Sequence, residues 1–460
     1  KIMSKLLFND FNAVTSKQWK QKIQADLKGA DYNDTLIWQT AEDIHVKPFY
    51  HADEFNFDLN KISNSKATEW NICQSIYVFD INKSNKKALQ AISKGAESIK
   101  FIIPNENTSI SNLIENIDTN KTTLHFELEF ISEEFIHQFV KISNSKKIYV
   151  FNDIIGNLVK SGNWYKSLED DHKKFDAITD KLHTISIDLG LYQNAGANIV
   201  QQLAYALAHT NEYLNHLDSK LNKEQKQTLK VVFNIAVGTN YFFEIAKLRA
   251  LRILWKSLAN MYNMNEACHL IVTPSKRNKT IYDYNTNLLR TTTECMSAIL
   301  GGANTVCNLA YDAIYHKDNE FGERIARNQL LILKHESYFD KVNNPSDGAY
   351  YIESLTNQLA EKSLELFKNI EANGGFLNQL KEGTIQRKIK ESAAKEQQQF
   401  DEAKEILLGS NIHPNPKDKI KQELELYTFV KINQRKTLIE PIIEKRLAEK
   451  LEQERLKKED

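Results

Sequence analysis

From about residue 70 onward, short apolar and β-branched runs alternate with longer amphipathic segments. The apolar runs are Ile72–Phe79, Ile99–Ile103, Leu124–Phe130, Ile148–Phe151, Thr184–Ile187, Val231–Val237, His269–Thr273 and Asn304–Leu309. Helical segments between them include Lys86–Ala96, Glu133–Ile142, Asn198–Leu214 and Asn240–Asn260. This alternation predicts parallel strands joined by crossover helices, and eight such units favour a closed barrel over an open sheet. We therefore predict an α/β protein with a TIM-type (β/α)8 barrel over residues 70–320.

The segments on either side of this barrel have different patterns. In a predicted N-terminal arm, residues 1–69, apolar side chains at Trp19, Ile23 and Leu27 fall on one helical face and predict a helix at Ser16–Leu27 that Gly29 ends. Residues 321–416 form a predicted helical extension, with helices at Gly322–Leu333, Leu355–Ile370 and Ile385–Leu408. An arm of this kind could wrap a partner subunit or pack on its own domain.

Residues 417–460 form a charged tail. The prolines of Asn411–Pro416 separate it from the helices before it, because proline cannot sit inside a helix. The stretch Ile442–Asp460 is a run of Lys, Arg and Glu with sparse leucines, which favours a solvated helix; a partner-binding helix is the alternative.

Composition narrows the possible environments and partners. The formal net charge is +0 over 460 residues, which gives no electrostatic reason to expect a nucleic acid or an anionic membrane as partner. No apolar run reaches the roughly 18 residues of a membrane span, and the first residues do not resemble a secretory signal. The four cysteines form no C-x-x-C pair and are expected to be buried thiols in a reducing compartment. We expect a cytoplasmic protein.

Common catalytic signatures are absent from the sequence. It contains no P-loop, no H-E-x-x-H, no G-x-S-x-G and no glycine-rich dinucleotide motif, and its His, Asp and Glu residues show no metal-ligand spacing. The pair Gly301-Gly302 favours a tight helix-to-strand turn over a phosphate cradle. His269 lies in an apolar run and is interpreted as a core histidine. The hydrophobic pattern and the motif search therefore predict an α/β barrel and indicate no catalytic activity.

Several sequence segments resemble those of one protein family. The segment Asn287-Leu-Leu-Arg-Thr-Thr-Thr-Glu-Cys-Met296 is similar to the "N-x-x-R-T-T-x-E-A-M" segment of methylmalonyl-CoA mutases. Further matches in the family's order are Gln193–Ala197, similar to its "Q-E-A-G-A" loop, Phe243–Ala250, Glu323–Asn328 and Asp347–Glu353. Trp19 and Asp26–Tyr32 resemble the family's small subunit in particular. The resemblance extends from about residue 15 to about residue 416.

The resemblance implies a fold and a reaction. In these mutases an acyl-CoA lies along the axis of a barrel, and adenosylcobalamin is held by a second, flavodoxin-like domain at the barrel mouth. The reaction interconverts methylmalonyl-CoA and succinyl-CoA through radicals. The cofactor carries out the difficult step, while the protein positions and shields the intermediates.

This sequence departs from the family where the catalytic residues would lie. Catalytic chains read "G-Y-H-M-Q-E-A-G-A", and their Tyr and His positions correspond here to Gly190 and Leu191. Neither residue can donate a hydrogen bond from its side chain to a thioester, so the resemblance implies no catalytic residue. Gln193, Asn194 and Glu294 are left as vestigial positions at the barrel mouth, and the "R-G-P-Y" substrate segment is absent.

The family's cobalamin motif, D-x-H-x-x-G, does not occur in the sequence. The strings Asp43-Ile-His45 and Asp170-Asp-His172 begin like it but lack the glycine. We therefore expect no cobalamin-binding flavodoxin-like domain in this sequence, no metal site, and adenosylcobalamin bound by a partner.

Three functions follow as hypotheses. The first is a small, non-catalytic subunit that stabilises a large cobalamin-binding subunit in a heterodimeric methylmalonyl-CoA mutase and is inactive alone. The second is the catalytic acyl-CoA-binding barrel of a mutase whose cobalamin domain is on another chain. The third is a free-standing CoA-ester-binding protein. The residues at Gly190 and Leu191 favour the first.

Overall fold

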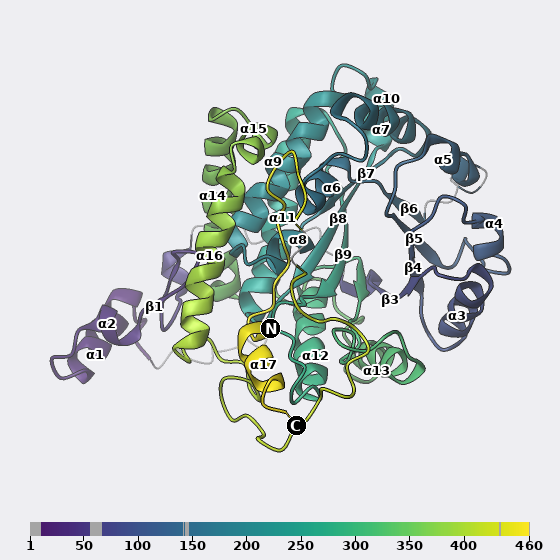
Figure 1. Ribbon diagram of the computed structural model, residues 1–460. Helices are drawn as coiled ribbons and strands as arrows, with labels where there is room; N and C mark the ends of the chain where they lie inside the picture. The colour runs from purple at the N-terminus through teal and green to yellow at the C-terminus, as the bar shows by residue number, and fades with distance from the viewer. Residues whose placement is uncertain (1–10, 56–66, 141, 143–146, 432–433, 460) are drawn as a thin grey trace, which may run out of the picture.

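The computed structural model describes residues 11–55, 67–140, 142, 147–431 and 434–459. Its centre is a sheet of eight parallel strands (Figure 1) in the order β6-β5-β4-β3-β10-β9-β8-β7. The strands are β3 (Asn71–Tyr77), β4 (Ser98–Ile103), β5 (Thr123–Leu128), β6 (Ile148–Phe151), β7 (Thr184–Asp188), β8 (Lys230–Val237), β9 (His269–Pro274) and β10 (Thr305–Cys307). All eight predicted runs are strands, and the predicted (β/α)8 barrel is confirmed.

The two outer strands, β6 and β7, close the barrel through side chains instead of a backbone ladder. The Asn152 backbone N–H, just after β6, donates to Ser186 Oγ of β7 over 2.9 Å, and Lys230 Nζ of β8 donates to the Ile148 carbonyl of β6 over 3.3 Å. The first predicted strand is too long by two residues. Phe79 is 94% exposed, and Asp80 already accepts a hydrogen bond from the Lys83 backbone as the cap of the next helix.

Helices surround the barrel. Those between the strands are α3 (Ile81–Ser93), α4 (Ile110–Leu113), α5 (Glu133–Val140), α6 (Ile154–Ser161), α7 (Leu168–Leu182), α8 (Gly190–Asn194), α9 (Ile199–Leu217), α10 (Lys223–Thr228), α11 (Tyr241–Met261) and α12 (Thr286–Leu300). Polar N-caps fix where many of them begin: Asn198, for example, forms a capping box with Gln201 at the start of α9. No helix in the described residues is long and apolar enough to cross a membrane.

Four α-helices lie between the last strand and the charged tail. They are α13 (Glu320–Leu331), α14 (Tyr350–Ala372), α15 (Phe376–Lys381) and α16 (Thr384–Asp401). Helix α13 packs beside α12 and β3, whereas the other three cover one side of the barrel (Figure 1). Helix α14 packs against α9 and α11, so α9 lies between the barrel and α14 and is buried on nearly all sides. Helix α16 ends earlier than predicted, because Ala403 adopts a left-handed conformation with φ +55°.

The N-terminal arm projects from this body (Figure 1). It contains α1 (Ser16–Asp26), α2 (Tyr32–Leu36) and a short hairpin of β1 (Trp38–Gln39) and β2 (His45–Val46). Helix α1 matches the predicted helix, and Gly29 follows it with φ +100°, which glycine adopts without strain. The helix buries none of its own residues, but Trp19 stacks on Phe49 with ring centroids 4.5 Å apart.

The charged tail is not the solvated helix predicted from its composition. Among the described residues of the tail only α17 (Glu449–Leu456) is helical, so the predicted helix is wrong over residues 442–448. Arg446 is buried and pairs with buried Glu452 over 2.6 Å, and Leu447 and Ala448 are also buried. Residues 427–431 and 434–447, which we call the C-terminal strap, run across the carboxyl ends of the barrel strands. Because its apolar and charged side chains find partners on the barrel, the tail folds back on it.

Candidate functional site

The candidate site is the barrel mouth, where the carboxyl ends of the strands meet. In barrels of this type, residues at these strand ends and in the loops after them form the active site. The structure places two cavities here, of about 460 and 350 Å³, which share Lys160. The larger lies between the mouth and the C-terminal strap, and the smaller lies over β5, β6, β7 and β8.

The loop after β7 contains Gly190 and Leu191, which the sequence predicted at the family's catalytic positions. The Gly190 backbone N–H donates to Asp188 Oδ1 over 2.9 Å, and a Cβ at this position would lie 3.1 Å from the same oxygen. Leu191 is buried but lines the larger cavity, so an apolar side chain faces the mouth. Neither side chain offers a proton or a hydrogen bond there.

Gln193 lies in a buried polar network and not in the mouth. Its amide nitrogen donates to Glu244 Oε1 over 2.9 Å, and its amide oxygen accepts from Lys247 Nζ over 2.8 Å. Lys247 also donates to the Ala236 carbonyl over 2.7 Å. Burial lowers the pKa of Lys247, while Glu244 opposes that change. This arrangement joins α8, β8 and α11 and leaves Gln193 no free group.

Asn194 and Glu294 are likewise held by hydrogen bonds. Asn194 Oδ1 accepts from Ser275 Oγ over 2.9 Å and from the Lys276 backbone N–H over 3.0 Å. Glu294 accepts from Lys279 Nζ at both oxygens, over 2.9 and 2.8 Å, and from Asn278 over 2.6 Å. Burial raises the pKa of Glu294 although Lys279 acts against it. The contacts are those of residues that fix α8 and α12 in place.

The axis of the barrel is filled by its own side chains. Alternate residues of the strands point inward, and their register brings them to the same levels. Phe151, Val232 and Ile271 form a separate, buried apolar cluster in the middle of the barrel. Below it, His125 Nε2 and His269 Nε2 are 3.0 Å apart, with His269 also 3.3 Å from Thr305 Oγ1, as expected for a core histidine.

Charged side chains surround the apolar cluster on the side of the mouth. Buried Lys100 pairs with Glu127 over 2.7 Å. Burial alone would raise the pKa of Glu127, but Lys100 and, more weakly, Lys160 and Lys276 lower it. Burial and the carboxylates of Glu127 and Asp153 raise the pKa of Asp188 to about 7. The mouth therefore contains a carboxyl group that titrates near neutral pH.

The smaller cavity is rich in carboxylates. Glu127, Glu129, Asp153 and Asp188 line it, together with Lys160 and Arg435 as the basic side chains. Both carboxylate oxygens of Asp153 already accept hydrogen bonds. Its Oδ1 accepts from His209 Nε2 over 2.9 Å, from the Tyr213 hydroxyl and from the Gly156 backbone N–H, and its Oδ2 accepts from the Asp188 backbone N–H. An anionic acyl group would meet these carboxylates at close range.

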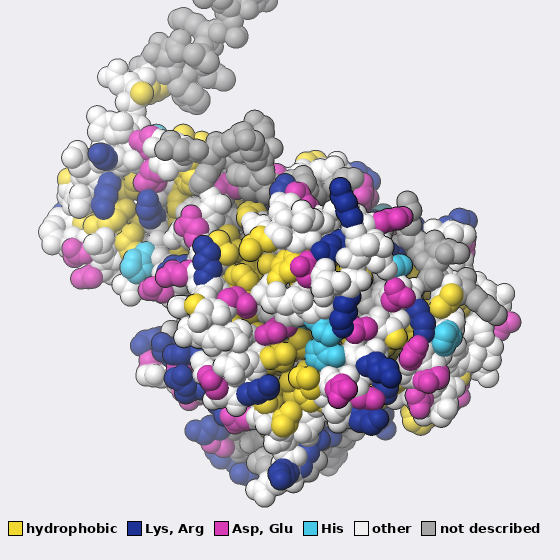
Figure 2. Space-filling view, turned by 90° about the horizontal axis from the view of Figure 1, so that it is seen from above, with side chains coloured by type: hydrophobic (Ala, Val, Ile, Leu, Met, Phe, Trp, Pro, Cys, Tyr) yellow, Lys and Arg dark blue, Asp and Glu magenta, His cyan; other side chains and the backbone are white. Residues whose placement is uncertain are grey.

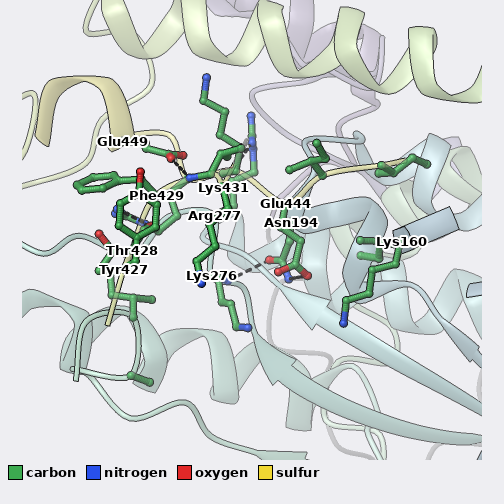
Figure 3. A pocket seen from close by; sticks show the side chains of 18 residues that line it. Lys160, Asn194, Lys276, Arg277, Tyr427, Thr428, Phe429, Lys431, Glu444 and Glu449 are labelled. Carbon is green, nitrogen blue, oxygen red and sulfur yellow. Dashed lines mark hydrogen bonds between the residues drawn. The ribbon is translucent and has the colours of Figure 1, made fainter. Parts of the chain in front are cut away.

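The C-terminal strap closes the other side of the mouth. Backbone hydrogen bonds fix it to α6, α8 and the loop after β9: the Ile442 N–H donates to the Val159 carbonyl over 2.8 Å, the Lys445 N–H to the Asn194 carbonyl over 3.0 Å, and the Leu447 N–H to the Arg277 carbonyl over 2.9 Å. Figure 3 shows the larger cavity beneath it, with Tyr427 and Phe429 at one end and Lys160 at the other.

The sequence comparisons match this architecture. The methylmalonyl-CoA mutase family model matches residues 113–458. The small subunit of methylmalonyl-CoA mutase from Porphyromonas gingivalis is 33% identical over 444 residues, which are 89% of this chain and 71% of that protein.

The chain belongs to the methylmalonyl-CoA mutase family.

Other mutases match a smaller part of the chain. The Rhizobium meliloti methylmalonyl-CoA mutase is 37% identical over 50% of this chain and 33% of its own length. The large subunit from Porphyromonas gingivalis is 31% identical over 52% of this chain and 34% of its own length. The small subunit of that organism thus resembles this chain over a much greater part of its sequence than the large subunit does.

Three features of the mouth were missed by sequence reasoning: the Lys100–Glu127 pair, Asp188 and the C-terminal strap. The first two had a signal, because a charged residue in the middle or at the end of a buried strand requires a partner. Lys100 lies inside the apolar run Ile99–Ile103, and Glu127 lies inside Leu124–Phe130. The strap had no such signal, since its sequence is charged and has no regular period.

Proposed function

We propose that this chain is the small, non-catalytic subunit of a heterodimeric, adenosylcobalamin-dependent methylmalonyl-CoA mutase. In this proposal a large subunit binds the cofactor and isomerises the acyl-CoA, and the present chain stabilises that subunit. The observation that carries the proposal is the filled barrel axis. An acyl-CoA along the axis would have to displace Phe151, Val232 and Ile271, which are buried against one another.

The chemistry of the mouth supports the same proposal. The positions that correspond to the family's Tyr and His are Gly190 and Leu191, which cannot stabilise charge on a thioester oxygen. The substrate's carboxylate would also lie near Glu127 and Asp188, where like charges disfavour binding. Adenosylcobalamin, when bound, supplies the carbon radical that begins the reaction. Among the described residues, the lining of the two mouth cavities contains no histidine for its cobalt.

The N-terminal arm supports the assembly part of the proposal. Figure 2 shows apolar side chains gathered over the arm. Phe11 is 75% exposed, Trp38 50% and Trp19 46%, although aromatic side chains of this size are usually covered. Aromatic residues are also enriched at interfaces between subunits. We infer that this arm contacts the large subunit.

The proposal is tested by reconstituting the complex with the large subunit and measuring turnover of methylmalonyl-CoA. We expect turnover only when both chains are present. Leu191→Ala in this chain should leave kcat nearly unchanged, whereas removal of the catalytic histidine of the large subunit should abolish it. A hundredfold loss of kcat from Leu191→Ala in a well-folded complex would show that this barrel takes part in the reaction.

A second experiment separates the proposal from the two alternatives, a catalytic half-barrel and a free-standing CoA-ester-binding protein. The isolated chain is titrated with methylmalonyl-pantetheine, which carries the thioester and the chain that would lie along the axis but no nucleotide. We expect no saturable heat of binding up to about 1 mM. Saturable binding of methylmalonyl-pantetheine would support the alternatives.

A further inference from the structure

The larger cavity is a second possible site, and its chemistry differs from that of the barrel axis. Six of its lining side chains are basic and two are acidic; the basic ones are Lys160, Lys276, Arg277, Lys431, Lys445 and Arg446. They come from α6, the loop after β9 and the C-terminal strap. A concave surface that collects one sign of charge from separate segments attracts a ligand of the opposite sign.

The two arginine side chains of this lining form ion pairs and hydrogen bonds that hold the strap in place. Arg277 Nε donates to Glu396 over 2.6 Å and Arg277 Nη1 donates to the Lys445 carbonyl over 2.7 Å. Arg446 pairs with Glu452 over 2.6 Å. These bonds neutralise the guanidinium groups and fix the shape of the cavity.

The lysine ammonium groups, in contrast, remain available. Within the described residues, Lys160, Lys276, Lys431 and Lys445 form no ion pair, and all four are exposed. The two acidic side chains of the lining accept hydrogen bonds from neighbouring groups: Glu449 accepts from the Val430 backbone N–H, and Glu444 accepts from the Asn194 amide over 3.2 Å. The lining therefore keeps an excess of positive charge after its internal bonds are made.

The other end of the cavity is aromatic. Tyr427 is 62% exposed, and its ring lies 5.7 Å from that of Phe429, which a guanidinium covers at 5.9 Å. The Tyr427 side chain is thus largely open to solvent, and stacking of a planar ring on an aromatic side chain does not depend strongly on the identity of a base. In Figure 3 Lys276 lies between these rings and Lys160.

We propose that the cavity between the barrel mouth and the C-terminal strap binds a nucleoside diphosphate or triphosphate, with its base on Tyr427 and its phosphates on Lys160 and Lys276. The volume of about 460 Å³ lies within the usual range for small-molecule sites. The inference does not rest on the proposed subunit role, since it uses neither the barrel axis nor the partner.

The test is calorimetric titration of the full chain with ADP, pyrophosphate and adenosine at low salt. We expect one saturable site for ADP, at least about tenfold weaker binding of adenosine, and an affinity that falls as salt is raised. The double substitution Lys160→Gln/Lys276→Gln should weaken ADP binding about tenfold or more. The matched control Lys83→Gln/Lys86→Gln removes the same charge from exposed positions on α3 and should leave the affinity unchanged.

A third variant checks the aromatic end of the cavity. Tyr427→Ala should weaken ADP several-fold and leave pyrophosphate binding unaltered, because only ADP carries a base. Thermal unfolding checks that each variant is folded; Tyr427→Ala and the control should unfold near the temperature of the unaltered protein, and the lysine variant slightly lower, because Lys160 and Lys276 also stabilise the buried Glu127 carboxylate. No saturable binding of ADP or pyrophosphate, or equal affinities in the lysine variant and its control, would overturn the assignment. Methylmalonyl-pantetheine carries no nucleotide, so its result bears only on the proposed function.

Discussion

Asp188→Asn should stabilise the protein at neutral and alkaline pH. Burial and the nearby carboxylates of Glu127, Asp153 and Glu444 raise the pKa of the Asp188 carboxyl from an ordinary 3.8 to about 7, against the opposing charge of Lys100. Each pH unit of such a difference corresponds to about 1.36 kcal/mol, which gives an upper limit of about 4 kcal/mol for the cost of ionising it in the folded state. Because the residue keeps partial contact with solvent, we expect about 2 kcal/mol.

The sign of the effect depends on pH. Below about pH 4 the carboxyl is protonated in both states and the substitution should change little. Between pH 4 and 7 the folded protein keeps a proton that the unfolded chain has lost, so this group makes the free energy of unfolding fall as pH rises. Above pH 7 the full cost is present, and asparagine, which is neutral and similar in shape, avoids it.

Thermal unfolding of the variant and the unaltered protein at pH 4.5 and pH 8 measures this difference. We expect a higher unfolding temperature for the variant at pH 8 and a much smaller gain at pH 4.5. Asp180→Asn, an exposed aspartate on α7, serves as the control and should have little effect at either pH. An equal gain at both pH values, or a loss at pH 8, would show that the carboxylates around Asp188 do not repel it as inferred.

Two further predictions concern buried polar groups, and both are checked by thermal unfolding. Lys279→Met leaves Glu294 buried without its cation and should cost about 3–5 kcal/mol, whereas Lys256→Met, at an exposed pair, should cost less than about 1 kcal/mol. Burial lowers the pKa of His269 to about 3, so the folded protein excludes a proton that the unfolded chain takes up below about pH 6.5. His269→Gln should therefore reduce the loss of stability between pH 6.5 and 4.5 by up to about 1.4 kcal/mol per pH unit, and an unchanged pH profile would contradict this reasoning.

The barrel was predictable from the sequence because parallel strands are covered on both faces and form short apolar runs. The helix at the start of the arm was predictable for a similar local reason, the spacing of Trp19 and Ile23. The path of the C-terminal strap was not predictable from the sequence. It depends on backbone hydrogen bonds to segments more than 150 residues away along the chain, such as the bond from the Leu447 N–H to the Arg277 carbonyl. Composition indicated a solvated charge run, but burial of Arg446 requires a partner that only the folded barrel supplies.

The candidate site, too, was predictable from the sequence in one part and not in another. The positions Gly190 and Leu191 could be assigned from the resemblance alone, because a catalytic histidine is either present or absent in a sequence. The filling of the barrel axis could not be predicted from the sequence, since it depends on which side chains of eight strands meet at one level of the axis. Phe151, Val232 and Ile271 are unremarkable apolar residues in their own strands.

In the proposed non-catalytic role, the filled axis gives a physical reason for the barrel to keep its shape. A barrel with an open axis must keep an internal surface solvated or covered by its ligand, whereas apolar side chains that meet there add core packing. Phe151 and Ile271 stabilise the barrel by packing in its interior and, in the proposed role, also keep an acyl-CoA out of the axis. A subunit whose role is to support a partner gains from the first effect and loses nothing from the second. We therefore expect that no single substitution gives this chain mutase activity: Leu191→His would place an imidazole at the mouth but leave the side chains in the axis beneath it.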